Sequence, residues 1–276
     1  MGSIADPDFR NFIVLNRDII LSTKNDYLKY ISIKMVTEIT LPSAELRQLF
    51  PKNGFRLTNI SLFSIAPPDH AQVTVQLLKK YYTAGELKTK TYVDGTSNVG
   101  GNIFPIVPLV KKIICVEIGN LTSKLLQHNL QTACTKKNLA KTLVLNKDFT
   151  KFNFKKYKPD IMFVDPPWGG KNYKKIKDKE LYLSKKPMSK LLVNKWIPAV
   201  DLIILRVPAG YPTRRLINFQ KIKYYTHVRL KTDYGRTIYK LLIFSKTPPI
   251  SPIPSDIIVK SVNYKSFHPT EVKNDN

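Results

Sequence analysis

The segment Ile161-Met162-Phe163-Val164-Asp165-Pro166-Pro167-Trp168-Gly169-Gly170 carries the strongest signal in this chain. Its first four residues form a short apolar run that is typical of a buried strand. An acid, two prolines and an aromatic ring then end the strand. Proline fixes the backbone and has no N–H, so the neighbouring carbonyls are left free to accept hydrogen bonds. We therefore expect a rigid strand tip that holds a planar ligand group.

The chain on both sides of this tip alternates between strand-like and helix-like patterns. Amphipathic helices are expected near 69–82 and 121–133, where apolar residues recur on one face. Such alternation with short connections favours an α/β fold with a mostly parallel sheet, closed by an antiparallel pair of strands at the end. The expected strands lie at 88–93, 112–117, 142–145, 161–164, 201–206, 225–230 and 238–244.

Three regions follow from these patterns. Residues 1–60 are expected to form a small accessory region, with strand-like alternation at 31–35 and a short helix at 44–50. Residues 61–247 hold the alternating strands and helices. Residues 248–276 are rich in proline and end in polar residues, which predicts a mostly extended tail.

The charge of the chain points to a polyanionic partner. The sequence has 276 residues, 45 Lys and Arg against 20 Asp and Glu, and a formal net charge of +25. Phosphate contacts release counterions and drive binding that does not depend on base sequence, so RNA or DNA is the expected partner. A merely solvated, lysine-rich surface is the alternative.

Other composition features exclude several classes of protein. Two cysteines are too few for a disulfide framework, and the four histidines lack metal-ligand spacing, so no metal is expected. The sequence shows no signal peptide and no run long enough to cross a bilayer, so no membrane partner is expected. We expect an intracellular protein, cytoplasmic or nuclear. The Lys, Ile and Asn bias is typical of an AT-rich genome, such as that of a microbe or a large virus.

A glycine-rich loop follows the first expected strand of the central region. The loop, residues 94–102, begins with Asp94 and contains Gly95, Gly100 and Gly101. Glycines at a strand-to-helix turn allow a ligand to approach the backbone closely. The second strand ends in Glu117, and an acid at that position can accept both hydroxyls of a ribose. This pairing predicts a site for a nucleoside cofactor.

At this point the motifs resemble a known family. An acidic glycine-rich loop, a ribose acid and a strand ending in Asp165-Pro166-Pro167-Trp168 resemble a class I S-adenosylmethionine-dependent methyltransferase that acts on amino groups. Within that group, Val99-Gly100-Gly101-Asn102 together with Pro166-Pro167-Trp168-Gly169-Gly170 is similar to the trimethylguanosine synthases. Those enzymes methylate the exocyclic N2 of guanine in a 7-methylguanosine RNA cap. The resemblance covers about residues 63–244.

The resemblance implies a Rossmann-like methyltransferase fold, S-adenosylmethionine as the cofactor and RNA, in capped form, as the partner. Asp165, Pro166 and Trp168 are then the expected catalytic residues. The residues expected to bind the cofactor are Asp94, Thr96, Asn98, Gly100, Glu117, Asp148 and Asp165. The residues expected to bind the substrate are Trp168, Lys171, Tyr173, Lys174 and Lys175, which begin a lysine-rich stretch reaching Lys195.

Two positions depart from the family pattern, and alternatives stay open. Asn98 stands where the family carries a glycine, and Lys171 stands where a proline follows the two glycines. Enzymes that methylate the N6 of adenine also use Asp-Pro-Pro-Trp. The other alternative is a catalytically inactive methyltransferase fold that binds RNA. For a second ring that sandwiches the base, the candidates are Tyr173, Tyr182 and Trp196.

Overall fold

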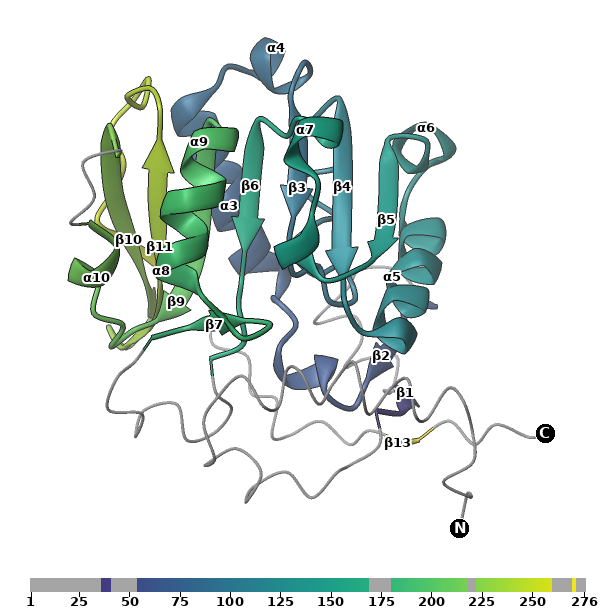
Figure 1. The fold of residues 1–276 in the computed structure, drawn as a ribbon. Coiled ribbons are helices and arrows are strands. Elements are labelled where there is room, and N and C mark those ends of the chain that lie inside the picture. The colour runs from purple at the N-terminus through teal and green to yellow at the C-terminus, as the bar shows by residue number, and fades with distance from the viewer. Residues whose placement is uncertain (1–35, 41–53, 169–179, 218–221, 260–269, 272–276) are drawn as a thin grey trace.

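The computed structural model describes residues 36–40, 54–168, 180–217, 222–259 and 270–271 (Figure 1). The strand and helix expected at 31–35 and 44–50 lie outside these residues. None of the helices in the described residues combines the length and hydrophobicity that a membrane crossing requires.

One mixed sheet of eight strands forms the centre of the molecule. Five consecutive strands of this sheet, β9, β6, β3, β4 and the edge strand β5, run parallel to one another. β10 and β11 form an antiparallel pair beside β9, and β12 pairs in parallel with β10 at the outer edge. In spatial order the strands are β12 (Asp256–Val259), β10 (Tyr224–Thr232), β11 (Thr237–Ser245), β9 (Leu202–Pro208), β6 (Ile161–Val164), β3 (Thr91–Asp94), β4 (Lys112–Glu117) and β5 (Thr142–Asn146).

Helices cover both faces of this sheet, as the sequence predicts for parallel strands. Successive side chains along a strand point to opposite faces of the sheet. Each of the five parallel strands therefore contributes residues to two separate apolar clusters, one on each face. One face packs against α3 (Pro68–Tyr81) and α5 (Asn120–Ala133). The opposite face packs against α7 (Phe154–Tyr157), α8 (Met188–Leu191) and the π-helical turn η4 (Leu192–Trp196). The expected α/β architecture is confirmed.

Smaller elements surround this core. The remaining helical segments are η1 (Ser61–Phe63), α4 (Ala84–Leu87), α6 (Lys136–Leu139), η2 (Phe149–Lys151), α9 (Ile197–Ala199) and α10 (Arg214–Ile217). The remaining strands are β1 (Glu38–Thr40), β2 (Leu57–Thr58), β7 (Tyr182–Leu183), β8 (Lys186–Pro187) and β13 (Thr270–Glu271).

Part of the expected C-terminal tail lies in the sheets. β12 extends the main sheet, because its backbone pairs with β10 over Arg229 to Thr232. β13 pairs with β1, and β1 pairs with β2, so residues 270–271 join residues 38–40 and 57–58 in a small three-stranded sheet. These segments are extended, but they are paired with the body of the molecule.

The parallel strands give the molecule two different ends. In Figure 1 the arrows of β3, β4, β5 and β6 point downwards, and α4, α6 and α7 lie at the top, where these strands begin. Open α/β sheets bind their ligands outside the carboxyl ends of the strands. We therefore expect the site at the lower edge in this view, where the parallel strands have their carboxyl ends.

Candidate active site

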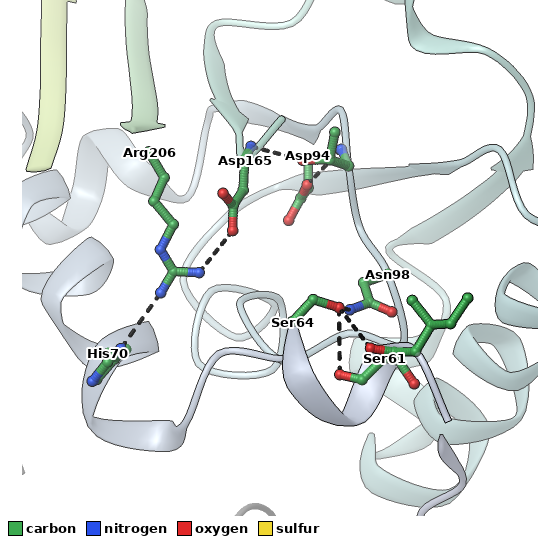
Figure 2. Close-up of polar contacts among 9 residues, drawn as sticks. Ser61, Ser64, His70, Asp94, Asn98, Asp165 and Arg206 are labelled. Carbon is green, nitrogen blue, oxygen red and sulfur yellow. Dashed lines mark hydrogen bonds and ion pairs between the residues drawn. The ribbon is translucent and has the colours of Figure 1, made fainter. Parts of the chain in front are cut away.

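Three acids lie at the carboxyl ends of three neighbouring strands. Asp94 and Glu117 are the last residues of β3 and β4, and Asp165 directly follows β6. β3 lies between β6 and β4 in the sheet, so the three acids share one edge. Figure 2 shows the Asp94 and Asp165 side chains on adjacent strand tips. The structure thus brings together residues that are up to 71 positions apart in the sequence.

The carboxylate of Asp94 is buried and only partly satisfied. The residue has 0% exposure, and its Oδ1 accepts a hydrogen bond from the Thr96 backbone N–H at 2.9 Å. Its Oδ2 has no hydrogen-bond partner within the described residues. Burial raises the pKa of Asp94 to about 7, although the Thr96 hydrogen bond opposes this shift. A buried acceptor without a partner is a candidate contact for a polar ligand group.

Thr96 links the tips of β3 and β6. Its backbone N–H binds Asp94, while its side-chain Oγ1 accepts the backbone N–H of Asp165 at 2.7 Å. One residue therefore fixes the position of both strand tips relative to each other. The sequence placed Thr96 among the cofactor contacts, and the structure gives it this bridging role as well.

Both oxygens of the Glu117 carboxylate are held by backbone N–H groups. Oε2 accepts from Asn98 at 2.9 Å and Oε1 accepts from Gly119 at 2.8 Å. Burial raises the pKa of Glu117, and these hydrogen bonds lower it. Each carboxylate oxygen can accept a further hydrogen bond, so the side chain is fixed but still able to bind hydroxyls.

The glycine-rich loop has the backbone that its sequence predicts. Gly100 has φ +106°, and a side chain at Gly101 would have its Cβ 2.8 Å from the Ala66 carbonyl oxygen. Asn98 takes φ +49°, in the left-handed region that asparagine tolerates better than most residues. The side chain of Asn98 donates to Ser64 Oγ at 2.9 Å (Figure 2). Asn98 therefore keeps the turn that a glycine would allow and adds a hydrogen bond to it.

The segment before α3 braces this loop. Besides the Ser64 contact, the buried side chain of Asn129 in α5 donates to the Val99 carbonyl at 3.0 Å. The same side chain accepts the Arg56 N–H at 2.8 Å and donates to the Arg56 carbonyl at 2.9 Å. Arg56 and Ser64, neither of which was among the predicted site residues, thus help to position the loop.

Asp165 forms a buried ion pair. Its Oδ2 lies 2.8 Å from Nη1 of Arg206, and the two side chains are 20% and 7% exposed. β6 and β9 are adjacent parallel strands with Val164 paired to Leu205, so the residue after each of these becomes a neighbour. Burial raises the pKa of Asp165, while the Arg206 guanidinium and the Trp168 side chain lower it. Arg206 therefore favours the ionised form of Asp165.

The guanidinium of Arg206 is itself fixed on the opposite side. It stacks on the Tyr239 ring, with 4.1 Å between the Arg206 Cζ and the ring centroid. Its Nη2 lies 3.5 Å from Nδ1 of His70, in the first turn of α3 (Figure 2). Both contacts come from the face of the sheet that α3 covers. Arg206 is thus held between a strand, a helix and the carboxylate that it binds.

The remaining tip residues are partly accessible. Pro166 is buried, Pro167 is exposed and Trp168 is partly exposed. Trp168 packs against apolar residues of both core clusters, and its ring centroid lies 6.3 Å from that of Tyr239. One part of the indole is therefore anchored while another part reaches solvent.

One of the candidates for a second stacking ring is wrong. Trp196 has 0% exposure and packs against Phe149, with 5.8 Å between ring centroids, in the core beneath the sheet. It cannot stack on a base, because the π-helical turn η4 directs it inwards. Tyr182 is partly exposed on β7. Tyr173 lies outside the described residues.

Of the remaining predicted site residues, Asp148, an expected cofactor contact, lies in the described part of the chain. Asp148 is partly exposed, and its Oδ1 caps η2 by accepting the Thr150 N–H at 2.8 Å. Gly169, Gly170, Lys171, Lys174 and Lys175 lie outside the described residues. No group of three or more His, Cys, Asp or Glu side chains in the described part of the chain is arranged to hold a metal ion.

Arg206, Tyr239 and His70 are the parts of this site that the sequence reasoning missed. Arg206 did leave a signal, because it interrupts the apolar run from Leu202 to Val207 in a strand that is buried throughout. A charged residue in such a strand requires a partner. The sequence did not indicate which residue that partner is.

Comparison with known proteins agrees with this geometry. Residues 89–238, more than half of the chain, match the family model described as RNA cap guanine-N2 methyltransferase. A curated relative, an uncharacterized protein of Acanthamoeba polyphaga mimivirus, is 26% identical over 148 residues, which are 51% of this chain and 54% of that protein. The chain thus spans about half the length of this relative.

One solved structure shares the fold over nearly the whole chain. A Porphyromonas gingivalis protein provisionally classed as a methyltransferase superposes with a TM-score of 0.54 at 12% identity, over 98% of this chain and 66% of its own. A 16S rRNA N2 methyltransferase from T. thermophilus, solved with AdoMet and guanosine, gives a TM-score of 0.47 at 14% identity, over 66% of this chain and 44% of its own. With the sheet order, the strand-end acids and the family match together, the chain has the fold of class I methyltransferases and belongs to the RNA cap guanine-N2 methyltransferase family, whose cofactor is S-adenosylmethionine.

Proposed function

We propose that this protein transfers a methyl group to the exocyclic N2 amine of guanine in a 7-methylguanosine RNA cap. The observation that carries the proposal is the Asp165 carboxylate. It is held in one orientation by Arg206, at the strand edge that also carries Asp94 and Glu117. The family match supports guanine N2 as the target, and the net charge of +25 supports RNA as the substrate.

The residues at the ends of β3 and β4 fit the cofactor. When bound, S-adenosylmethionine supplies an electrophilic methyl group on a positively charged sulfur. Asp94 offers a buried acceptor oxygen that has no partner within the described residues and suits the ammonium group of a methionine moiety. Glu117 offers oriented acceptors for ribose hydroxyls. The full set of proposed contacts is Asp94, Thr96, Asn98, Gly100, Glu117, Asp148 and Asp165.

The tip after β6 would activate the amine. The lone pair of an exocyclic purine amine is delocalised into the ring, so the nitrogen is a poor nucleophile. Asp165 and the Pro166 carbonyl accept the two N–H bonds and favour a pyramidal nitrogen. This stabilises the transition state more than the ground state. Because Arg206 holds Oδ2 of Asp165, the carboxylate needs no rearrangement during the reaction.

Trp168 and the following stretch would bind the rest of the substrate. The exposed part of the Trp168 indole can stack on the base, and a positively charged 7-methylguanine would add a cation–π term of about 0.5–2 kcal/mol. Lys171, Tyr173, Lys174 and Lys175 directly follow the tip in sequence. We assign them to the phosphates that lead away from the base.

A substrate panel with two matched variants tests the proposal. The panel contains m7G-capped RNA, the same RNA without a cap, and DNA, with a labelled methyl donor. Asp165→Asn should lower turnover on capped RNA by about 10²–10³-fold, since a preorganised charged acceptor is removed. Asp201→Asn is the control, because Asp201 precedes the neighbouring strand β9 at its opposite end, with a side chain that is 48% exposed, and should leave turnover unchanged.

These measurements distinguish guanine N2 transfer from adenine N6 transfer and from an inactive RNA-binding protein. Asp165 is only one of the seven proposed cofactor contacts, and Asp94 and Glu117 are unchanged in the variant. Calorimetry with S-adenosylhomocysteine should therefore show that Asp165→Asn still binds the cofactor product, with affinity reduced far less than turnover. Methylation of adenine in the panel would replace guanine N2 by adenine N6 as the target. Full turnover in Asp165→Asn would remove the proposed acceptor. A wild-type protein that binds RNA but neither binds the cofactor product nor transfers a methyl group would instead be an inactive RNA-binding subunit.

A further inference from the structure

A dense group of lysines lies at the amino ends of β3, β4, β5 and β6, opposite the candidate active site. The segments that lead into these strands are 84–90, 111–112, 135–141 and 154–160, and they contain ten lysines and two acids. The segments that follow the same strands, 94–100, 117–120, 146–151 and 165–168, contain two lysines and four acids. The positive charge of the described residues around these strands is therefore concentrated at the end away from the site.

These lysines are neighbours in space. The Lys111 and Lys112 N–H groups both donate to the Lys90 carbonyl, at 3.0 and 3.4 Å, and the Ile113 N–H donates to the Lys141 carbonyl at 2.9 Å. The backbone thus connects the entries to β3, β4 and β5. α4, α6 and α7 all lie at this end of the sheet in Figure 1. Adjacent strands are about 4.8 Å apart, so the four entries span about 15 Å. We call this the amino-end surface.

The two acids at the amino-end surface are already engaged. Glu86 closes a capping box with Thr83 at the start of α4. Asp160 accepts the Thr91 N–H at 2.7 Å and lies 3.6 Å from the Lys90 Nζ. Lys111, Lys137 and Lys155 are exposed and form no ion pair within the described residues. Their charge is therefore available to a partner.

The chemistry of the surface favours phosphates over a protein partner. Protein interfaces are built around buried apolar and aromatic side chains. The exposed large apolar residues of the described chain are Ile60, Tyr224, Tyr234, Ile250 and Ile258, and none belongs to the amino-end surface. Lysine binds phosphate as a flexible point charge that does not read base sequence.

We infer that the amino-end surface is a second contact site for RNA, which binds the phosphodiester backbone of a long substrate away from the reacting base. The inference rests on the proposed function, because it takes RNA as the substrate. β3, β4, β5 and β6 are 4–6 residues long, so the two ends lie about 13–20 Å apart. A capped dinucleotide bound at Trp168 is too short to reach the amino-end surface, whereas a long RNA can contact both.

Two triple variants test this inference. The first replaces Lys111, Lys137 and Lys155 with Gln, which removes one exposed charge at the entry to each of β4, β5 and β6. The control replaces Lys124, Lys223 and Arg236 with Gln, three exposed cations that lie elsewhere. Affinity for an uncapped RNA of a few tens of nucleotides is measured by fluorescence anisotropy across a salt series, and turnover is measured on a capped dinucleotide.

The first variant should bind RNA about tenfold more weakly. The plot of log K against log salt has a negative slope, and this slope should become less steep by about 2. Each phosphate that is no longer neutralised reduces its magnitude by about 0.7. The control should change both quantities much less. Turnover on the capped dinucleotide should be unchanged in both.

The inference would be overturned if both variants lost RNA affinity equally, or if the first variant lost none. Binding of an acidic protein to the same surface would not rescue it. Because the binding assay needs no catalysis, an inactive wild type would refute the proposed function alone.

Discussion

The two ends of β3, β4, β5 and β6 hold their charges in opposite ways. At the carboxyl ends, Asp94, Glu117 and Asp165 are held by backbone N–H groups or by Arg206, at sites of low exposure. At the amino ends, most of the lysines are exposed and project into solvent. Buried charges interact strongly and depend on geometry, whereas exposed charges are screened over about 8 Å at physiological salt.

This difference shows what each end is suited to do. A site that must orient one amine needs few charges in fixed positions, because reorganisation during the reaction would cost free energy. A surface that binds a flexible phosphate chain needs many charges and little geometry. In the proposed function the same strands supply both, because a parallel sheet has two unlike edges.

The largest effect is expected from breaking the Asp165–Arg206 pair. Arg206→Met should lower the free energy of unfolding by about 3–5 kcal/mol, because a carboxylate is left without its buried partner. Denaturant melts of the wild type and the variant measure this decrease. The pKa of Asp165 should also rise in Arg206→Met, so turnover should be lost at low pH and recover as the pH increases.

Arg206→Lys is the conservative companion to this variant. It retains a positive charge and should restore part of the stability and part of the pH profile. A merely structural role would predict lower stability with an unchanged pH profile of turnover. That result in both variants would show that Arg206 does not position Asp165 for the reaction.

The next effect concerns the buried Asp94. Its pKa is raised from 3.8 to about 7 in the folded protein, so the folded state binds this proton more tightly than the unfolded chain does. This contribution therefore favours folding at low pH and is lost as the pH rises from about 4 to about 7, by up to about 4 kcal/mol. Asp94→Asn, compared with the wild type in denaturant melts across this range without cofactor, should remove that part of the pH dependence. If the free energy of unfolding depended on pH in the same way in both proteins, the raised pKa of Asp94 would be contradicted.

The smallest effect is expected at the amino-end surface. The Lys111, Lys137 and Lys155 triple variant should change the free energy of unfolding by no more than about 0.5 kcal/mol, because these side chains are exposed to solvent. Thermal melts at low and high salt check this, and they also confirm that any decrease in RNA affinity does not come from unfolding. A destabilisation as large as that of Arg206→Met would mean that the two ends do not differ as described.

Much of the fold could be predicted from local patterns. β4 and β6 have the expected bounds, because continuous apolar runs mark strands that are buried on both faces. β3 begins at Thr91 instead of Lys88, since the capping box at Thr83 starts α4 in that segment. β9 continues to Pro208 because β11 pairs with it as far as Tyr239. Pairing partners from distant segments decide such boundaries.

The candidate site could also be predicted only in part, because local patterns do not show which distant residues become neighbours. The turn was predicted from the glycines that follow the strand, and Asn98, which departs from the family pattern, keeps a left-handed backbone that asparagine tolerates. Trp196 was misread as a candidate stacking ring, because a single aromatic residue in sequence does not reveal which side of a helix the core covers. β12 was expected within a tail, since its pairing depends on the open edge that β10 provides.

The sequence by itself determined that an acid stands at the end of each of β3, β4 and β6, and therefore that these acids share one edge of the sheet. Parallel strands impose this, because each strand that points the same way places its last residue at the same end. Only the tertiary structure decided that Asp165 is paired with Arg206, 41 residues away. That ion pair depends on β6 and β9 being neighbours in register, and strand order is set by the packing of the whole sheet rather than by local sequence.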